Sequence, residues 1–371
     1  MRILYIFPEE FPNNKARGIQ VAHSIFALAS QGINVDFAYV PLKNFPNPFH
    51  FYGLRIPETL RLVPLSRTIC NIKSNRIFFW NFKKWFKKLQ KHPDCIVVRH
   101  IKIAYFLLIN FPQIPLIYEA HEVFSDVASK NIKTKIHKIE NFISSKSSII
   151  IANSNVTAER LREKYLTNRK IFVVPNGVKI YEMSSNKHWH EIHKNIIYTG
   201  SLFKWKGVED LVEASRFLSG FKITIIGGNS SQIERLKRKM NPNGAEIVFL
   251  GYLPYQETIQ YLQKACIAII PNRNESPSHF TSPLKLFEYM AAGCAIIASD
   301  IPSLHEVLNN DEAIWFEPGN PYSLSEAIKI LASDVEKAKK MGEMMRNKAN
   351  NYTWDLRAKK IIEIINEKLF K

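Results

Sequence analysis

Short runs rich in aliphatic and β-branched residues alternate with segments of helical period along most of the chain. This alternation is typical of βαβ units, in which helices cover a parallel sheet. The strands predicted in the first half are Ile3–Phe7, Asn34–Val40, Cys95–Val98, Leu116–Glu119, Ser148–Ala152 and Ile171–Val174. Those predicted in the second half are Asn195–Thr199, Lys222–Ile226, Ile247–Leu250, Ile267–Ile270, Ala295–Ala298 and Ala313–Phe316. The chain is therefore predicted to be an α/β protein with two Rossmann-like parallel sheets.

The length of 371 residues exceeds what a single hydrophobic core usually supports, which favours two domains. We place the first domain at residues 1–178 and the second at 195–350. The polar segment 179–194 is interpreted as the linker. The last segment, 351–371, is predicted to be a helix that crosses back to the first domain.

Several features restrict the class of protein. No run of 18 apolar residues occurs, and the apolar run at the start is too short for a signal peptide. The cysteines are far apart and form no CxxC pair, so neither a zinc site nor a disulfide framework is indicated; they are Cys70, Cys95, Cys266 and Cys294. We expect a cytoplasmic protein.

The chain carries 51 basic and 33 acidic residues, a net charge of +18. Such a charge favours an anionic partner, which could be a phosphorylated substrate, an anionic membrane or a nucleic acid. No RRM, KH, helix-turn-helix or zinc-finger pattern occurs. Nucleic acid is therefore not the expected partner, although a basic nucleic-acid-binding protein remains the rival from another class.

Residues 75–92 read NRIFFWNFKKWFKKLQKH, which on a helix gathers the aromatic side chains on one side and the lysines on the others. This pattern fits a helix lying on anionic lipid, and it also fits a Rossmann helix whose aromatic face packs on the sheet. The preceding stretch, 41–75, holds five prolines and is predicted to be irregular. Together with the net charge, it favours a peripheral contact with an anionic membrane.

Ligands bind outside the carboxyl ends of strands in open α/β sheets, so segments that follow predicted strands are the candidate sites. GSLFKWKG begins at Gly200, directly after a strand, and carries Lys206 just before a helix. Backbone N–H groups and a nearby ammonium can bind a diphosphate there, although an ordinary turn with a solvated lysine fits equally well. Neither GxxxxGK[ST] nor GxGxxG occurs, which argues against ATP hydrolysis and NAD chemistry.

Two further candidates lie in comparable places. SPSHFTSPLKLFEYMAAG predicts a helix from near Pro283 that carries Glu288, either on an exposed face or as a buried acceptor for ligand hydroxyls. His121 follows a predicted strand and could donate to a sugar or transfer a proton, although a lone histidine is more often structural. HWHEIH at 188–193 lacks the HExxH spacing, so no metal site is predicted there.

The segments IIYTGSLFKWKGVEDL, FLGYLP and SPLKLFEYMAAGCAIIASDIPSLHEV, with IIIANSNVTAERL and VVPNGV upstream, together resemble the retaining family-4 glycosyltransferases of GT-B fold. The resemblance implies two Rossmann-like domains that face a central cleft. It also implies that Lys206 binds the donor phosphates, that Glu288 holds the ribose hydroxyls and that His121 lies beside the transferred sugar. The other donor-binding positions that it implies are Gly18, Gly200, Ser201, Thr281, Ser282, Pro283 and Leu284.

Three positions depart from the family pattern. Ser201 stands where an arginine is frequent, so one phosphate-binding cation is either missing or supplied by Lys204. The first glutamate of the E-x7-E motif would fall on Phe280, with Glu275 five residues earlier. Gly18 stands alone where two glycines often occur.

The resemblance implies transfer of a sugar from a nucleotide-diphosphate donor to a glycan or lipid-linked acceptor, with retention of anomeric configuration. No metal and no cofactor are implied, and the departing diphosphate would assist deprotonation of the acceptor. The usual setting is synthesis of a bacterial surface polysaccharide or lipopolysaccharide. A sugar-nucleotide epimerase and a phosphorylase are alternatives on the same fold.

Overall fold

The computed structural model describes residues 1–370 except 43–44, 71, 166–169, 183–186 and 281. By its internal contacts the chain divides into two compact units. The first comprises Met1–Gly177 together with Trp354–Lys371, and the second is Val178–Thr353. Residues 179–194, interpreted above as a linker, are thus counted within the second unit, where the buried Ile192 belongs to the hydrophobic core.

The first unit contains a seven-stranded sheet in the order β3-β2-β1-β6-β7-β8-β9, and all of its strand pairs are parallel. The strands are β1 (Arg2–Phe11), β2 (Asn34–Pro41), β3 (Leu60–Pro64), β6 (Cys95–Val98), β7 (Leu116–Ala120), β8 (Ile149–Ala152) and β9 (Ile171–Val173). The inner strands β6 and β8 are apolar and buried along their whole length, as parallel strands covered by helices require.

The stretch 41–75 is more ordered than the sequence suggested. It contains β3 at the edge of the sheet, a 3-10 turn η1 (His50–Tyr52), and a two-stranded antiparallel hairpin of β4 (Thr68–Ile69) and β5 (Ile72–Lys73). The prediction of an irregular segment was therefore wrong for these residues.

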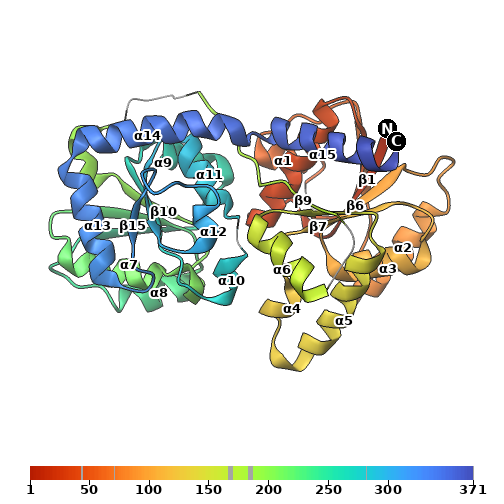
Figure 1. Ribbon diagram of the computed structural model, residues 1–371, viewed down its shortest axis with the longest axis horizontal. Coiled ribbons are helices and arrows are strands. Elements are labelled where there is room, and N and C mark those ends of the chain that lie inside the picture. Colours follow the sequence, from red (N-terminus) through yellow and green to blue (C-terminus); the bar gives the residue numbers. More distant parts are fainter. Residues whose placement is uncertain (43–44, 71, 166–169, 183–186, 281, 371) are drawn as a thin grey trace. The chain divides into compact units, whose positions relative to one another are not determined.

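Helices cover both faces of the first sheet (Figure 1). On one side α1 (Ala16–Ser30) packs along α15 (Trp354–Leu369), so the last helix belongs to the first unit. On the other side lie α2 (Asn75–Phe86), α3 (Ile101–Asn110), α4 (Phe124–Val127), α5 (Lys130–Lys146) and α6 (Asn155–Tyr165).

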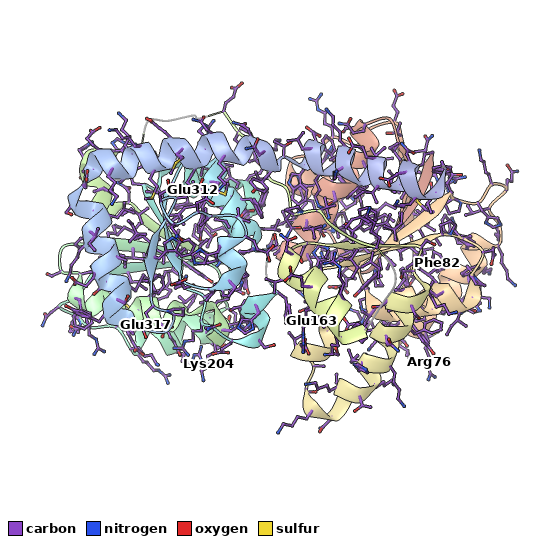
Figure 2. All side chains as sticks on the ribbon, viewed as in Figure 1. Arg76, Phe82, Glu163, Lys204, Glu312 and Glu317 are labelled. Atoms are coloured by element: carbon purple, nitrogen blue, oxygen red, sulfur yellow. The ribbon has the colours of Figure 1, made fainter. Side chains whose placement is uncertain are left out.

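In α2 the aromatic face is used for packing. Phe78, Phe82 and Phe86 are buried within the first unit, and Phe82 is labelled in Figure 2. The interpretation of this helix as a Rossmann helix with its aromatic face against the protein is therefore correct for these three side chains. Within the residues that the structure places, no helix is long and apolar enough to cross a membrane.

The second unit contains a six-stranded parallel sheet in the order β12-β11-β10-β13-β14-β15. The strands are β10 (Ile196–Thr199), β11 (Lys222–Ile226), β12 (Glu246–Gly251), β13 (Ile267–Ile270), β14 (Ala295–Ser299) and β15 (Ile314–Phe316). Each strand predicted for this half is present.

Figure 1 shows α7 and α8 on one side of this sheet and α9, α11 and α14 on the other. The helices are α7 (Val208–Ala214), α8 (Ser230–Lys237), α9 (Tyr255–Lys264), α10 (Ser276–His279), α11 (Leu284–Ala291), α12 (Pro302–His305), α13 (Pro321–Ser333) and α14 (Val335–Ala349). Short 3-10 turns complete the unit: η2 (Trp189–Lys194), η3 (Lys204–Lys206), η4 (Ser215–Phe217) and η5 (Asn350–Tyr352).

Both sheets reverse their strand order at one place. The first unit runs outward from β1 through β2 to β3 and then returns to β6 on the other side of β1. The second runs from β10 through β11 to β12 and returns to β13 beside β10. Connections after the two strands that flank a reversal diverge and leave a crevice at their carboxyl ends, where ligands of such sheets bind.

Candidate active site

Close backbone packing shapes the loop after β10. Gly200 has φ +127° and donates its N–H to Ile226 O at 2.9 Å. A β-carbon added at Gly227 would lie 2.0 Å from Gly200 O, so the loops after β10 and β11 touch through backbone atoms. Tyr198 donates to Ser201 O at 2.8 Å and fixes the start of the loop. Glycines are required here because side chains would separate the two loops.

Lys206 ends η3 in this loop and is 9% exposed. Its Nζ lies 3.8 Å from the centroid of the Trp205 ring, which stabilises the ammonium. Burial lowers the pKa of Lys206 to about 7. The next residue, Gly207, has φ +67°, and a β-carbon there would lie 1.7 Å from Pro271 O. The lysine is thus held on a loop that packs tightly against the end of β13.

Glu288 lies in the middle of α11 and is half-buried. Burial raises the pKa of Glu288 to about 7, while nearby Lys285 and a hydrogen bond with Tyr255 act in the opposite direction. Tyr289 holds the helix in place because its hydroxyl accepts the N–H of Thr199, at the end of β10, at 2.8 Å. A carboxyl in this environment can accept hydrogen bonds from ligand hydroxyls.

Lys285 was not among the residues singled out from the sequence. It lies one turn before Glu288 on α11 and is 8% exposed. Its Nζ lies 3.8 Å from the Tyr198 ring centroid and has no hydrogen-bond partner among the residues that the structure places. Burial, and then the charge of Lys206, holds the pKa of Lys285 well below its usual range. Two lysines therefore share one site beside the loop after β10.

The segment before α11 is only partly described. Thr281, a predicted donor-binding residue, lies outside the described residues. Ser282 and Pro283 are buried, and Pro283 is the N-cap of α11, with Leu284 as the first helical residue. No side chain caps this end of α11 among the placed residues, so N–H groups of its first turn can meet an anion.

Phe280 occupies the position expected for the first glutamate of the motif. Its side chain is 5% exposed and apolar, and it directly follows α10. Glu275 is exposed and hence does not replace the missing carboxylate in the interior. The departure at Phe280 noted in the sequence is therefore a difference in the chemistry of the site, which offers an aromatic ring where the family pattern has a carboxylate.

Asn272 is a second residue that sequence reasoning missed. It follows β13, at the strand reversal of the second sheet, and is fully buried. Neither Oδ1 nor Nδ2 has a hydrogen-bond partner within the described parts of the chain. Its position just after the predicted strand Ile267–Ile270 was the available signal, because polar residues at that edge are candidates for ligand contact.

In the first unit His121 follows β7. Its backbone oxygen accepts a hydrogen bond from Asn153 Nδ2 at 3.1 Å, whereas its buried Nε2 has no partner among the placed residues. Burial, and then the charges of Arg99 and Arg357, holds the pKa of His121 well below its usual range. The ring is therefore neutral at neutral pH and can donate or accept one hydrogen bond through Nε2.

Arg99 and Gly18 lie near the strand reversal of the first sheet. Arg99 follows β6, and its Nη1 donates to Gln20 Oε1 at 2.6 Å. Gly18 lies in the first turn of α1, where a β-carbon would lie 2.5 Å from Asn13 Oδ1 and 2.9 Å from the Tyr52 hydroxyl. The structure thus gives Gly18 a packing role in the loop after β1, and its predicted contact with the donor stays a prediction.

Ser201, Gly200, Lys206, Pro283 and Glu288 thus lie in one unit, and His121 and Gly18 lie in the other. Across the described ranges no three His, Cys, Asp or Glu side chains are grouped as metal ligands would be. The chemistry available is the binding of an anion by buried ammonium groups and N–H groups, together with hydroxyl recognition by a carboxyl.

Two Rossmann-like parallel-sheet units are the architecture of the GT-B glycosyltransferases. The description "Glycosyltransferase Family 4" matches residues 19–181, and "Glycosyl transferases group 1" matches residues 182–348. The chain belongs to this family of glycosyltransferases, which confirms the resemblance seen in its motifs.

Three relatives illustrate the similarity. An uncharacterized glycosyltransferase of Methanocaldococcus jannaschii, MJ1069, is 25% identical over 350 residues, 88% of each chain. The N,N'-diacetylbacillosaminyl-diphospho-undecaprenol alpha-1,3-N-acetylgalactosaminyltransferase of Campylobacter jejuni is 25% identical over 58% of this chain and 59% of that protein. The structure of Anabaena Alr3699/HepE in complex with UDP has a TM-score of 0.75 at 14% identity and covers 99% of this chain and 100% of that one.

Proposed function

We propose that this glycosyltransferase moves a sugar from a nucleotide-diphosphate-sugar to a hydroxyl of a glycan or lipid-linked acceptor, with retention of anomeric configuration and without a metal. The observation that carries the proposal is the burial of Lys206 on the loop after β10, together with a half-buried Glu288 on α11, whose neighbour Tyr289 contacts the end of β10. Lys206 has no carboxylate partner among the described residues, and a buried ammonium of this kind is costly unless an anion such as a donor diphosphate binds to it.

The second unit would hold the donor. Lys206 contacts the phosphates, and Glu288 accepts hydrogen bonds from the ribose hydroxyls. N–H groups around Ser282, Pro283 and Leu284 complete the anion site, except where proline has none. When the ribose and the diphosphate are both held, the anomeric carbon of the transferred sugar is oriented toward the acceptor.

In the reaction the bond between the anomeric carbon and the phosphate oxygen breaks, and a bond from the acceptor oxygen to the same face of that carbon forms. The acceptor proton passes to the departing phosphate. Lys206 stabilises the charge that develops on this phosphate. His121, neutral because of its burial, donates a hydrogen bond to the sugar through Nε2.

Two observations support the proposed acceptor and the proposed biosynthetic pathway. The name of the Campylobacter relative specifies a diphospho-undecaprenol acceptor. The net charge of +18 suits an acceptor that carries phosphate or lies on an anionic membrane. We propose synthesis of a bacterial surface polysaccharide or lipopolysaccharide at the cytoplasmic side of the membrane.

A peripheral membrane contact is supported by a patch on the first unit rather than by the buried face of α2. Ile69, Ile72 and Trp80 are exposed by 45%, 67% and 57%. Asn81 Nδ2 donates to Ser66 O at 2.9 Å and joins α2 to the segment just before β4, the strand that carries Ile69. Nearby cations of the same segments are Arg67, Lys73, Arg76, Lys83, Lys84, Lys87 and Lys88. Apolar side chains within a basic surface suit anionic lipid.

Cosedimentation with vesicles tests the membrane contact. Vesicles of phosphatidylcholine with phosphatidylglycerol are expected to bind the protein, and phosphatidylcholine alone to bind it weakly. Ile72→Asp, at an exposed position, is expected to reduce binding without changing the melting temperature. Equal binding by this variant and the unaltered protein would refute the assigned patch.

A thermal-shift screen against UDP, GDP, ADP, CMP and their sugar conjugates tests the proposed donor. A ligand that binds only the folded protein stabilises it by about 2.7 kcal/mol at a hundredfold excess over Kd. One nucleoside diphosphate is expected to raise Tm in the unaltered protein but not in Lys206→Met. No shift with any nucleotide, with a salt-sensitive shift for oligonucleotides, would instead favour the nucleic-acid-binding alternative.

A further inference from the structure

Two lysines in the loop after β10 differ in their surroundings. Lys206 is buried, whereas Lys204, labelled in Figure 2, is exposed. A donor diphosphate carries more than one negative charge, so a single buried ammonium leaves charge without a close partner. The loop residue next to Gly200 is Ser201, which supplies no cation. A second buried cation, if one acts here, comes from another element.

Lys285 of α11 is a candidate for this second buried cation. A β-carbon added at Gly200 would lie 3.0 Å from its Nζ and 3.2 Å from its Cε, so the ammonium lies against the start of the loop. The glycine makes room for it, because any side chain at Gly200 would occupy the same space. Lys285 also lies in the first turn of α11, next to the N–H groups that can meet an anion.

The surroundings of Lys285 do not satisfy its charge. Nζ has no hydrogen-bond partner among the placed residues, although an ammonium has three N–H donors. The face of Tyr198 and the charge of Glu288 compensate in part. The second ammonium, that of Lys206, acts against it. Such an arrangement is unfavourable in the absence of an anion and is relieved when one binds.

We propose that Lys285 binds the donor diphosphate as a second cation, opposite Lys206. The inference rests on the proposed function and names a residue of the same donor site. Since both ammonium groups are pushed toward the neutral state by burial, a diphosphate that binds between them would draw protons onto the site. The other role open to Lys285 is structural, as a cation packed on Tyr198 that supports the fold and contacts no ligand.

Isothermal titration of Lys285→Met separates these roles. The probes are UDP, GDP and ADP, each compared with its parent nucleoside. For the diphosphate that the unaltered protein binds, we expect Kd to rise by about 30-fold in Lys285→Met, the size of one lost hydrogen-bonded charge. The Kd of the parent nucleoside is expected to stay within about twofold, because the nucleoside lacks phosphates. Lys339→Met, at an exposed position on α14, serves as the matched control.

The melting temperature of the unliganded protein shows whether the Lys285→Met variant is folded. Lys285→Met is expected to melt no lower than the unaltered protein, because it removes a buried charge without a close partner. A lower melting temperature with loss of both diphosphate and nucleoside binding would show the structural role and overturn the inference. An unchanged diphosphate Kd in Lys285→Met, or a loss only in Lys204→Met, would overturn it as well. If the unaltered protein bound no nucleoside diphosphate, the proposed function itself would fail.

Discussion

Arg357 of α15 and Glu119 of β7 form an ion pair in which Nη2 and Oε1 are 2.8 Å apart, with side chains only 4% and 2% exposed. The same guanidinium donates to Pro175 O at 3.1 Å and to Ser24 Oγ at 3.3 Å. It therefore joins the last helix of the chain to the sheet, to α1 and to the segment after β9. In the sequence, the whole second unit lies between α15 and the rest of the first unit. The ion pair therefore binds a segment that is distant in the sequence to the core of the first unit.

Arg357→Ala is expected to lower the free energy of unfolding of the first unit by about 3–5 kcal/mol, since the buried Glu119 would lose its ion-pair partner and keep the hydrogen bond from the Tyr5 hydroxyl. Denaturant melts followed by circular dichroism measure the change. Lys360→Ala on the exposed side of α15, whose ion pair with Glu363 spans 3.8 Å, is expected to have almost no effect. Equal stability of the two variants would contradict the account of how α15 is held.

The burial of Lys206 makes the stability of the unliganded protein depend on pH. Its pKa is about 7 in the folded protein and near 10.5 when unfolded. Between these values the unfolded state binds more protons, so stability rises with pH across this window. The pKa of Glu288 is raised from 4.5 to about 7. Its contribution to stability therefore changes only below pH 7, where it decreases as the pH rises. Melts at pH 7 and 9 are expected to show a higher Tm at pH 9.

Lys206→Met is expected to reduce this gain between pH 7 and 9 and to melt above the unaltered protein at pH 7, because it removes a buried charge. Part of the rise in stability between pH 7 and 9 is expected to remain, since the pKa of Lys285 is also lowered by burial. A variant that kept the full pH dependence would show that Lys206 is solvated.

Recognition of the nucleoside is expected to weaken below pH 7. An ionised Glu288 is the stronger acceptor for ribose hydroxyls, and its pKa of about 7 means that the carboxyl becomes protonated just below neutrality. The Kd of the parent nucleoside, titrated at pH 6 and 8, is expected to be higher at pH 6. In Glu288→Gln the affinity is expected to be lower at both values and to lose this dependence.

Gly18→Ala is expected to destabilise the first unit by about 1–3 kcal/mol, because the new methyl would overlap Asn13 and the Tyr52 hydroxyl. Tyr52 both accepts from Asn13 N and donates to Asn13 O, so the loop after β1 has little room to move. A thermal melt measures the effect. A methyl tolerated without loss of stability would contradict the packing role of Gly18.

The periodic parts of the fold could be predicted from the sequence, because parallel strands buried on both faces leave continuous apolar runs such as Cys95–Val98 and Ile267–Ile270. Leu60–Pro64 was missed since its neighbourhood is rich in proline, which argues against a strand in general. This strand lies at the sheet edge and is bounded by prolines, where the lost N–H groups matter least.

The candidate site was predictable where a residue follows a strand, as with Lys206 and His121. Lys285 gave no such signal, because it lies inside a helix of mostly apolar residues and looks like a solvated lysine. Only its packing against Gly200, which depends on how α11 meets the end of β10, places it in the site. Whether a lysine in a helix is solvated or buried depends on tertiary contacts that a periodic pattern does not contain.

The most direct test of sugar transfer with retention is proton NMR of the reaction itself. The nucleotide sugar that raises Tm most in the screen is incubated with the protein and a polyprenyl-diphosphate-linked glycan fraction, and the anomeric proton of the product is recorded. The account predicts release of the nucleoside diphosphate and an α-linked product from an α-linked donor, with both lost in Lys206→Met. A β-linked product, or a donor that is converted without any acceptor present, would contradict it.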